Sequence, residues 1–410
     1  MALLLTNRPF RLLFSATAVS NLGDGVSALA FPWLATLITR DPMLIALVAF
    51  ATSLPWFLFS IPAGVIVDRY DRRMLMVRAD LFRLALTCGV IALVFSVPEF
   101  PPPDDALSYI LVLAAFGLLL GTAEVIRDNA AQTVLPSLVA KSELETANGQ
   151  LWSIEQVMGS FVGPPLAGVL IAFAVPAPFT LDALTFGIAA WLVWCIALPR
   201  RPAPPRRRIG PEIAEGWRWM REHATILRLA LMLGVINAVS VMAMTILVLF
   251  SQEVLGLTAA QHGLLMTAGA AGGVIGGLVG PKIIARIGPQ AGVFVALCLM
   301  ILPYSILCLT SDPFIAGIAL FIEVFAALMW NIVTVSYRQR RIPDALLGRV
   351  NSLYRFFGWG MMPIGALMGG VIVAWAEAHM ARDVALKLPY AIAAAASLLM
   401  LAYAARKLRL

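Results

Sequence analysis

Long apolar stretches recur along the whole chain, separated by short breaks that carry charged, proline or glycine residues. Crossing a hydrocarbon layer of about 30 Å takes roughly 20 residues of helix, and each stretch is long enough. Backbone groups in lipid must be satisfied within their own segment, and barrel strands are shorter than these windows, so we expect helices. The twelve expected spans are 10–38, 43–67, 74–97, 107–127, 147–174, 179–198, 226–251, 259–281, 289–310, 313–337, 346–376 and 388–405.

The composition excludes a soluble protein. Of the 410 residues, 60% are hydrophobic and 13% are charged, and the mean hydropathy is +0.88, whereas soluble domains are roughly 45–50% apolar and about 25% charged. Twelve spans leave no room for a large soluble domain. The first apolar stretch is too long for a signal peptide, so we interpret it as the first span.

Lysine and arginine gather in alternate loops, which indicates orientation. With an even number of spans both termini share one side, and most of the basic loop residues fall on that side, whereas the opposite loops hold little beyond Arg40, Arg382 and Lys387. By the positive-inside rule both termini are cytoplasmic, and we expect a multi-pass protein of a bacterial inner membrane. The formal charge of +7 then reflects topology and attraction to lipid headgroups, not nucleic-acid binding.

A hydrophilic stretch near the middle, Pro199–His223, divides the spans into two sets of six. We expect an N-terminal bundle over 1–198, a cytoplasmic linker with a short interfacial helix (212–221) over 199–225, and a C-terminal bundle over 226–410. Gly64 to Arg73 after span 2 is echoed by Gly277 to Arg286 after span 8. Such repetition is typical of transporters that rock two bundles around a central site. Since the halves can bury each other, we expect a monomer.

Cysteine and histidine indicate neither a disulfide framework nor a metal site. The four cysteines lie singly in apolar runs, and the three histidines lie far apart. Neither a GxxxxGK[ST] phosphate-binding loop nor an HExxH zinc motif occurs. We expect no cofactor and no bound metal, and the sequence favours neither ATP-driven transport nor an intramembrane enzyme.

Carboxylates in the middle of apolar spans are costly and are therefore functional candidates. The candidates for binding a proton or cation are Asp24, Glu323, Glu155 and Glu124. A carboxyl group that faces a partly dry cavity binds and releases protons near neutral pH, because desolvation disfavours its charged form. The alternative is a carboxylate permanently paired with an arginine, for which Arg83 is available to Asp24 and Arg355 to Glu155. Asp182 is interpreted as a helix cap.

Two glycine-containing motifs have structural interpretations. At the end of span 2, Asp68 can pair with Arg127 or with a helix N-terminus and so latch the cytoplasmic side; the neighbouring arginines can also be plain topology residues. In span 5, small residues every four positions favour close helix approach, and Pro164 loosens the hydrogen-bond ladder. That stripe either seals a contact between the halves or is ordinary packing. The residues concerned are Gly64, Asp68, Arg69, Arg72, Arg73 and Arg127 for the first motif, and Gly159, Gly163, Pro164, Ala167 and Gly168 for the second.

The same motifs carry a resemblance to a known family. The run from Gly64 to Arg73 resembles the loop 2–3 signature of the major facilitator superfamily, and Gly159 to Gly168 resembles the helix 5 motif of its drug antiporters. Further runs are similar to its branch of macrolide and siderophore exporters, among them Ser20 to Asp24 and Asp182 to Phe186. The resemblance implies two six-helix bundles whose helices 1, 4, 7 and 10 line a cavity. Polar and aromatic candidates for the cavity wall are Asn21, Asn237, Asn331, Trp330 and Phe31.

Together these features predict a secondary transporter. The first hypothesis is a proton-coupled exporter of an amphipathic small molecule, of the drug or siderophore class, working by alternating access. An importer or a lysolipid flippase on the same scaffold is the alternative. The expected partners of the transporter are the substrate, protons and membrane lipids.

Overall fold

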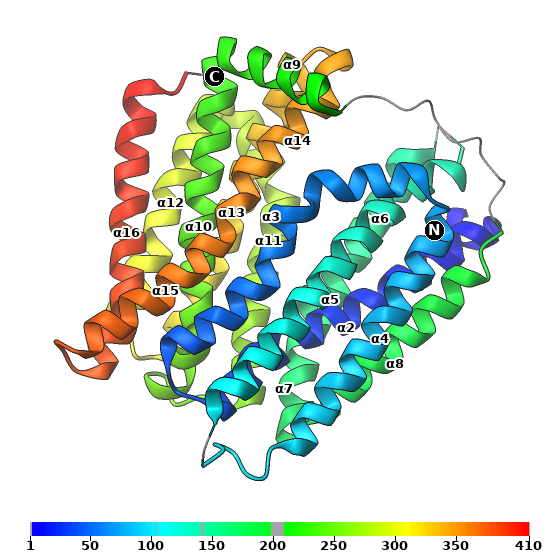
Figure 1. Cartoon of the computed structure of the whole chain (residues 1–410). Coiled ribbons are helices and arrows are strands. Elements are labelled where there is room, and N and C mark those ends of the chain that lie inside the picture. The colour runs from blue at the N-terminus through cyan, green and yellow to red at the C-terminus, as the bar shows by residue number, and fades with distance from the viewer. Residues whose placement is uncertain (1, 104, 141–142, 198–208, 410) are drawn as a thin grey trace. The chain divides into compact units, whose positions relative to one another are not determined.

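A computed structural model describes residues 2–103, 105–140, 143–197 and 209–409 (Figure 1). Within these ranges the chain is helical and contains no strand. The first half comprises α1 (Ala2–Thr6), α2 (Arg8–Ile38), α3 (Pro42–Arg69), α4 (Arg72–Ser96), α5 (Ala106–Val134), η1 (Leu135–Ser137), α6 (Leu144–Glu155), η3 (Gln156–Val162), α7 (Gly163–Phe173) and α8 (Ala177–Trp194). The second comprises α9 (Ile209–Glu222), α10 (Ala224–Glu253), α11 (Ala259–Ile287), α12 (Pro289–Leu309), α13 (Pro313–Arg341), α14 (Asp344–Gly360), α15 (Met362–Glu377) and α16 (Arg382–Lys407).

The expected all-α membrane class is confirmed. Eleven segments of the described chain are long and apolar enough to cross a membrane. The remaining long helix, α2, has 31 residues. Its polar residues Asn21 and Asp24 lower its apolar content, although its length suffices for a crossing.

Polar side chains at the loop ends fix where several helices begin. Asn7 caps α2 by accepting a hydrogen bond from the Phe10 amide at 3.0 Å. Asp71 accepts from Met74 at the start of α4, also at 3.0 Å, and Asp312 caps α13. Each side-chain oxygen satisfies an amide that has no partner within its own helix.

The fifth span is an α-helix that is interrupted in its middle by a π-helical segment. The expected single segment at 147–174 consists of α6, the π-helical η3 and α7. At the junction, the Gly163 amide bonds to the carbonyl of Met158, five residues back. Pro164 lacks an amide hydrogen, and the ladder loosens next to it, as expected. The eleventh span is similarly divided into α14 and α15 at Met361.

The described residues form two compact units. The first contains the described parts of Met1–Thr39, Ala51–Arg206 and Thr258–Leu264; the second contains those of Arg40–Phe50, Arg207–Leu257 and Leu265–Leu410. In the first unit α2 packs against α7 and α8, and α4 packs against α5 and α8. In the second unit α10 packs against α14, α15 and α16, and α12 packs against α13 and α16. The start of α3 therefore belongs to the second unit, and the start of α11 to the first.

Helix α9 belongs to the second unit and packs against α14 and α10. Met220 is fully buried, and the rings of Trp217 and Phe357 lie 5.7 Å apart. Glu215 also forms an ion pair with Arg349 on α14. A short helix was expected at 212–221, and the observed helix extends over 209–222. It packs against α14.

Candidate functional site

The first unit contains a buried network of charges in its middle. Asp80 on α4 is fully buried, and its Oδ1 lies 3.4 Å from Arg127 Nε on α5 and 3.9 Å from Arg83 Nη1 one turn along α4. Both arginines are at least 97% buried. Buried charges are tolerated when they are paired, and Asp80 is placed between two cations.

Asp24 joins this network from α2. Its Oδ1 contacts Arg83 Nη2, while Arg83 Nη1 lies 3.4 Å from the Ser20 hydroxyl. The guanidinium of Arg83 also lies 3.9 Å from the ring centroid of Phe186, a favourable position for a cation. Of the two alternatives for Asp24, the structure places it in the ion pair with Arg83.

Asp182 does not cap its helix, contrary to the interpretation from sequence. Helix α8 begins at Ala177, so Asp182 lies inside it, 1% exposed. It accepts a hydrogen bond from the Ser27 hydroxyl of α2 at 2.5 Å. The span boundary was placed two residues too late, because proline at position 178 is tolerated in a first helical turn.

The other acids of the first unit are more open. Glu124 and Glu155 are half-buried on α5 and α6. Asp128 lies next to Arg127, with its Oδ1 3.4 Å from Arg127 Nη1, and its side chain is 37% exposed. The described charges in and around the network therefore include more acids than arginines.

Glu323 in the second unit has a different environment. It is 6% exposed, and its Oε1 accepts hydrogen bonds from the hydroxyls of Ser240 at 2.8 Å and Tyr304 at 2.9 Å. Its Oε2 has no hydrogen-bond partner, and no cation forms an ion pair with it, among the described residues. This carboxyl group is held by neutral hydroxyls from α10 and α12.

A small cavity of about 30 Å³ lies next to this carboxyl group, with room for one or two water molecules. Its wall is mostly apolar and includes Met300, Met400 and Ala327, while Ser240, Tyr304, Glu323 and Ser397 supply oxygen atoms. A lone acid next to a water-sized space is suited to hold a proton and release it when water gains access.

The residues expected to line a substrate cavity differ in their solvent exposure. Phe31 and Trp330 are buried, and Phe31 packs edge-on against Phe179. Asn21 and Asn237 are half-buried and donate to backbone carbonyls, Asn21 to Thr17 and Asn237 to Gly358. Asn331 is exposed on α13.

The loop motif after the second span is described in part. The surroundings of Gly64 and the side chains of Asp68 and Arg69 lie outside the described residues, so the pairing expected between Asp68 and Arg127 stays a prediction. Arg72 donates to the Thr133 carbonyl at 2.9 Å, and Arg73 to that of Ile196 at 3.0 Å. These two arginines therefore satisfy carbonyls at the ends of α5 and α8, beyond any role in topology.

The glycine stripe of the fifth span contacts α2 within the same unit. A side chain at Gly25 would meet the Gly159 carbonyl oxygen at 2.2 Å, and one at Gly163 would meet the Gly25 backbone at 2.6 Å. Gly168 instead approaches Ala259, at the start of α11. Most of the stripe therefore serves packing within the first unit.

Sequence reasoning missed Asp80, Ser240 and Tyr304. Asp80 had a detectable signal, because an acid three residues before Arg83 in an apolar span implies a paired charge. Ser240 and Tyr304 had none, since single hydroxyl residues are common in membrane helices and their convergence on Glu323 depends on the fold.

Membrane-spanning helices that carry buried polar groups are typical of membrane transport proteins, and the family that the chain matches is one of transporters of the major facilitator type, not of enzymes. The chain belongs to the family described as transmembrane secretion effector, which matches residues 3–410.

Curated relatives and solved structures agree with this assignment. The enterobactin exporter of Salmonella typhi is 26% identical over 376 residues, covering 90% of this chain and 87% of the exporter. That of Escherichia coli O1:K1 / APEC is 25% identical over 374 residues, with the same coverage. A bacterial homologue of the iron transporter ferroportin, in an inward-facing state, has a TM-score of 0.74 at 18% identity, covering 97% of this chain and 98% of that chain. An auto-inhibited peptide transporter of the POT family has a TM-score of 0.72 at 12% identity, with 98% of both chains covered. At these identities the structures support the fold alone.

Proposed function

We propose that this protein is a proton-coupled exporter of an amphipathic small molecule, of the drug or siderophore class, in a bacterial inner membrane. Export is supported by relatives that are named exporters at 25–26% identity. The single observation that supports proton coupling is Glu323, a buried carboxyl group whose described partners are two hydroxyls.

The hydrogen bonds suggest where the proton is held. Ser240 and Tyr304 both donate to Oε1, which leaves Oε2 as the oxygen that carries the proton. Loss of this proton would place an unpaired charge in an apolar wall, which is strongly unfavourable unless water or a cation enters. Proton release is therefore tied to a conformation in which the cavity is hydrated, as alternating access requires.

Asp24 has a structural role in this proposal. It forms an ion pair with Arg83, which also lies near Asp80, so we assign it to the charge network that holds α2 and α4 together. Glu124 and Glu155 are second-rank candidates because they are half-buried.

The test uses purified protein in liposomes that contain a pH-sensitive dye. A pH gradient is imposed, and enterobactin and a fluorescent hydrophobic dye are added separately as probes. We expect at least one probe to move against its gradient while protons cross the membrane in the opposite direction, down the imposed gradient and in proportion to the probe moved. Probe transport that is undiminished when a protonophore collapses the gradient would refute coupling.

Glu323→Gln is the informative variant, because glutamine keeps the shape and neutrality of a protonated acid. We expect gradient-driven transport to fall by about a hundredfold or more, the range in which positioned proton-transfer groups contribute, while probe exchange without a gradient persists. The matched control is Glu143→Gln, at a half-buried acid that bonds to its own loop. Equal gradient-driven rates for Glu323→Gln and wild type would exclude Glu323 as the proton carrier.

A further inference from the structure

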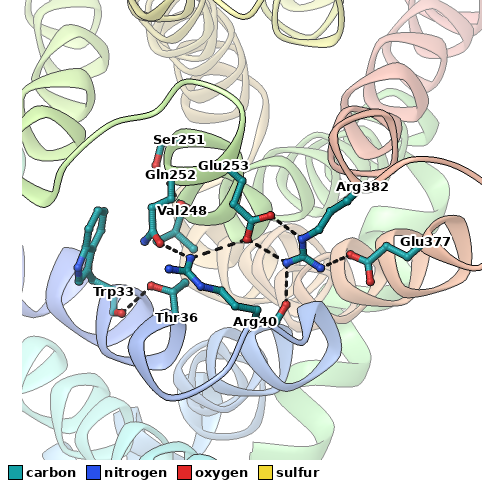
Figure 2. A network of polar contacts seen from close by, with 9 residues as sticks. All are labelled: Trp33, Thr36, Arg40, Val248, Ser251, Gln252, Glu253, Glu377 and Arg382. Atoms are coloured by element: carbon teal, nitrogen blue, oxygen red, sulfur yellow. Dashed lines mark hydrogen bonds and ion pairs between the residues drawn. The ribbon is translucent and has the colours of Figure 1, made fainter. Parts of the chain in front are cut away.

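Arg382, at the start of α16, contacts three separate chain segments at once (Figure 2). It donates twice to Glu253 at the end of α10, from Nε at 2.5 Å and from Nη2 at 3.0 Å. Its Nη1 donates to Glu377 at the end of α15 at 2.6 Å. Its Nη2 also donates to the backbone carbonyl of Arg40 at 2.8 Å, just before α3.

The Arg40 side chain strengthens this arrangement. Its guanidinium contacts the amide oxygen of Gln252 and lies 3.8 Å from Glu253. Two arginines and two glutamates thus form a neutral group in which Glu253 is shared. We call Arg40, Glu253, Glu377 and Arg382 the clasp.

The clasp lies where the chain passes from one unit to the other. Residues 40–50 belong to the second unit, whereas α3 from Ala51 onward belongs to the first. Close packing accompanies the ionic contacts, because Gly370 on α15 allows Ala46 and the Pro42 carbonyl to approach where a side chain would meet them at 2.4 and 2.6 Å. The start of α3 is therefore attached to the second unit by both charge and shape.

We propose that the clasp is a reversible ionic device that holds the start of α3 on the second unit in one transport state and opens in another. The side chains of Arg382, Glu253 and Glu377 are 36%, 24% and 26% exposed. Water therefore reaches all three when the contacts break, so opening leaves no charge buried. The bidentate Arg382–Glu253 pair gives the closed form a defined geometry. This inference rests on the alternating access of the proposed function, but it does not depend on the coupling ion or the substrate.

Spin-label distances in the full chain test the proposal. Labels are placed at Met43→Cys and Val384→Cys, whose native side chains are 39% and 50% exposed, after Cys88, Cys195, Cys298 and Cys308 are replaced by alanine. Both positions lie within a few residues of the clasp. Reconstituted protein should show a short distance as its main population.

Arg382→Gln and Glu253→Gln each remove charge from the clasp, and we expect each to raise the longer-distance population by about fivefold or more. Arg40→Ala should have a smaller effect, because Arg382 bonds to the backbone of residue 40 and not to its side chain. The matched control is Lys387→Gln, which removes a cation from the same helix, α16. The described contact of Lys387 is with the Ser311 hydroxyl and not with the clasp, so this variant should leave the distances unchanged.

Salt supplies a measurement that requires no clasp variant. At about 1 M salt, interactions between exposed charges are screened beyond about 3 Å, so the longer-distance population of the otherwise native chain should also rise. Unchanged distances in both glutamine variants and at high salt would overturn the proposal. If a glutamine variant fails to fold, an absent salt response is sufficient to overturn it.

Discussion

Replacing Asp80 by asparagine should strongly destabilise the first unit. Asp80 is fully buried and is shared by Arg127 at 3.4 Å and Arg83 at 3.9 Å. Asparagine preserves the shape and removes the charge, which leaves Arg127 with Asp128 and Arg83 with Asp24. Removing one partner of a buried pair costs about 3–5 kcal/mol when the remaining charge has no other partner. Because both arginines keep a second acid, we expect the free energy of unfolding to fall by about 1–3 kcal/mol.

Asp128→Asn is the matched control for this experiment. It removes the same charge from the same arginine, at the same 3.4 Å distance, but from a side chain that is 37% exposed. Exposed ion pairs contribute about 0.2–1 kcal/mol. The two variants therefore differ in burial far more than in chemistry.

The free energies are measured by unfolding in mixed detergent and SDS, followed by the fluorescence of the ten tryptophans. Asp80→Asn should shift the midpoint far more than Asp128→Asn. Adding Arg127→Met to Asp80→Asn should cost less than the two single changes summed, by about 0.5–3 kcal/mol, since the double variant no longer buries Arg127 without Asp80. Equal effects of Asp80→Asn and Asp128→Asn would mean that Asp80 is uncharged in the native protein, and the reasoning would fail.

Three further outcomes are expected. Gly25→Ala should reduce the folded yield, because the new methyl carbon would meet the Gly159 carbonyl oxygen at 2.2 Å. Gly149→Ala has open space around it and should stabilise its helix by up to about 1 kcal/mol, and thermal melts compare the two variants. Met220→Ala should cost about 2–5 kcal/mol and expose α9 to hydrogen exchange, whereas the exposed Arg218→Ala should not. Tyr304→Phe removes one donor to the buried acid and should cost about 1–3 kcal/mol in the same SDS unfolding assay; no loss would contradict that hydrogen bond.

Helix positions were predictable because lipid imposes both composition and length. The span expected at 289–310 is observed as Pro289–Leu309, and that at 226–251 as Ala224–Glu253. The fourth span was underestimated, since α5 continues past Arg127 to Val134. Polar residues there were interpreted as a loop, although the helix continues because these side chains pair within the bundle or bond back to its own carbonyls.

The candidate sites were predictable as residue types but not as pairs. An acid in an apolar span is conspicuous, so Asp24 and Glu323 could be named from sequence. Whether each has a cation depends on helix rotation: Arg83 is 59 positions from Asp24, and no periodicity connects them. The same limit applies to Phe31 and Trp330, which are buried in the structure, because composition does not specify which face of a hydrophobic helix is turned inward.

The π-helical turn at Gln156–Val162 has a consequence for comparing sequences. A turn of this kind accommodates one residue more than an α-helical turn. Deleting a single residue from the stretch would restore regular α-helical geometry while α6 and α7 keep nearly the same faces toward their neighbours, because the wider turn already takes up the extra residue. A homologue shorter by one position here could therefore present the same side of its fifth membrane helix to α2, so an alignment gap at this stretch implies no change in packing.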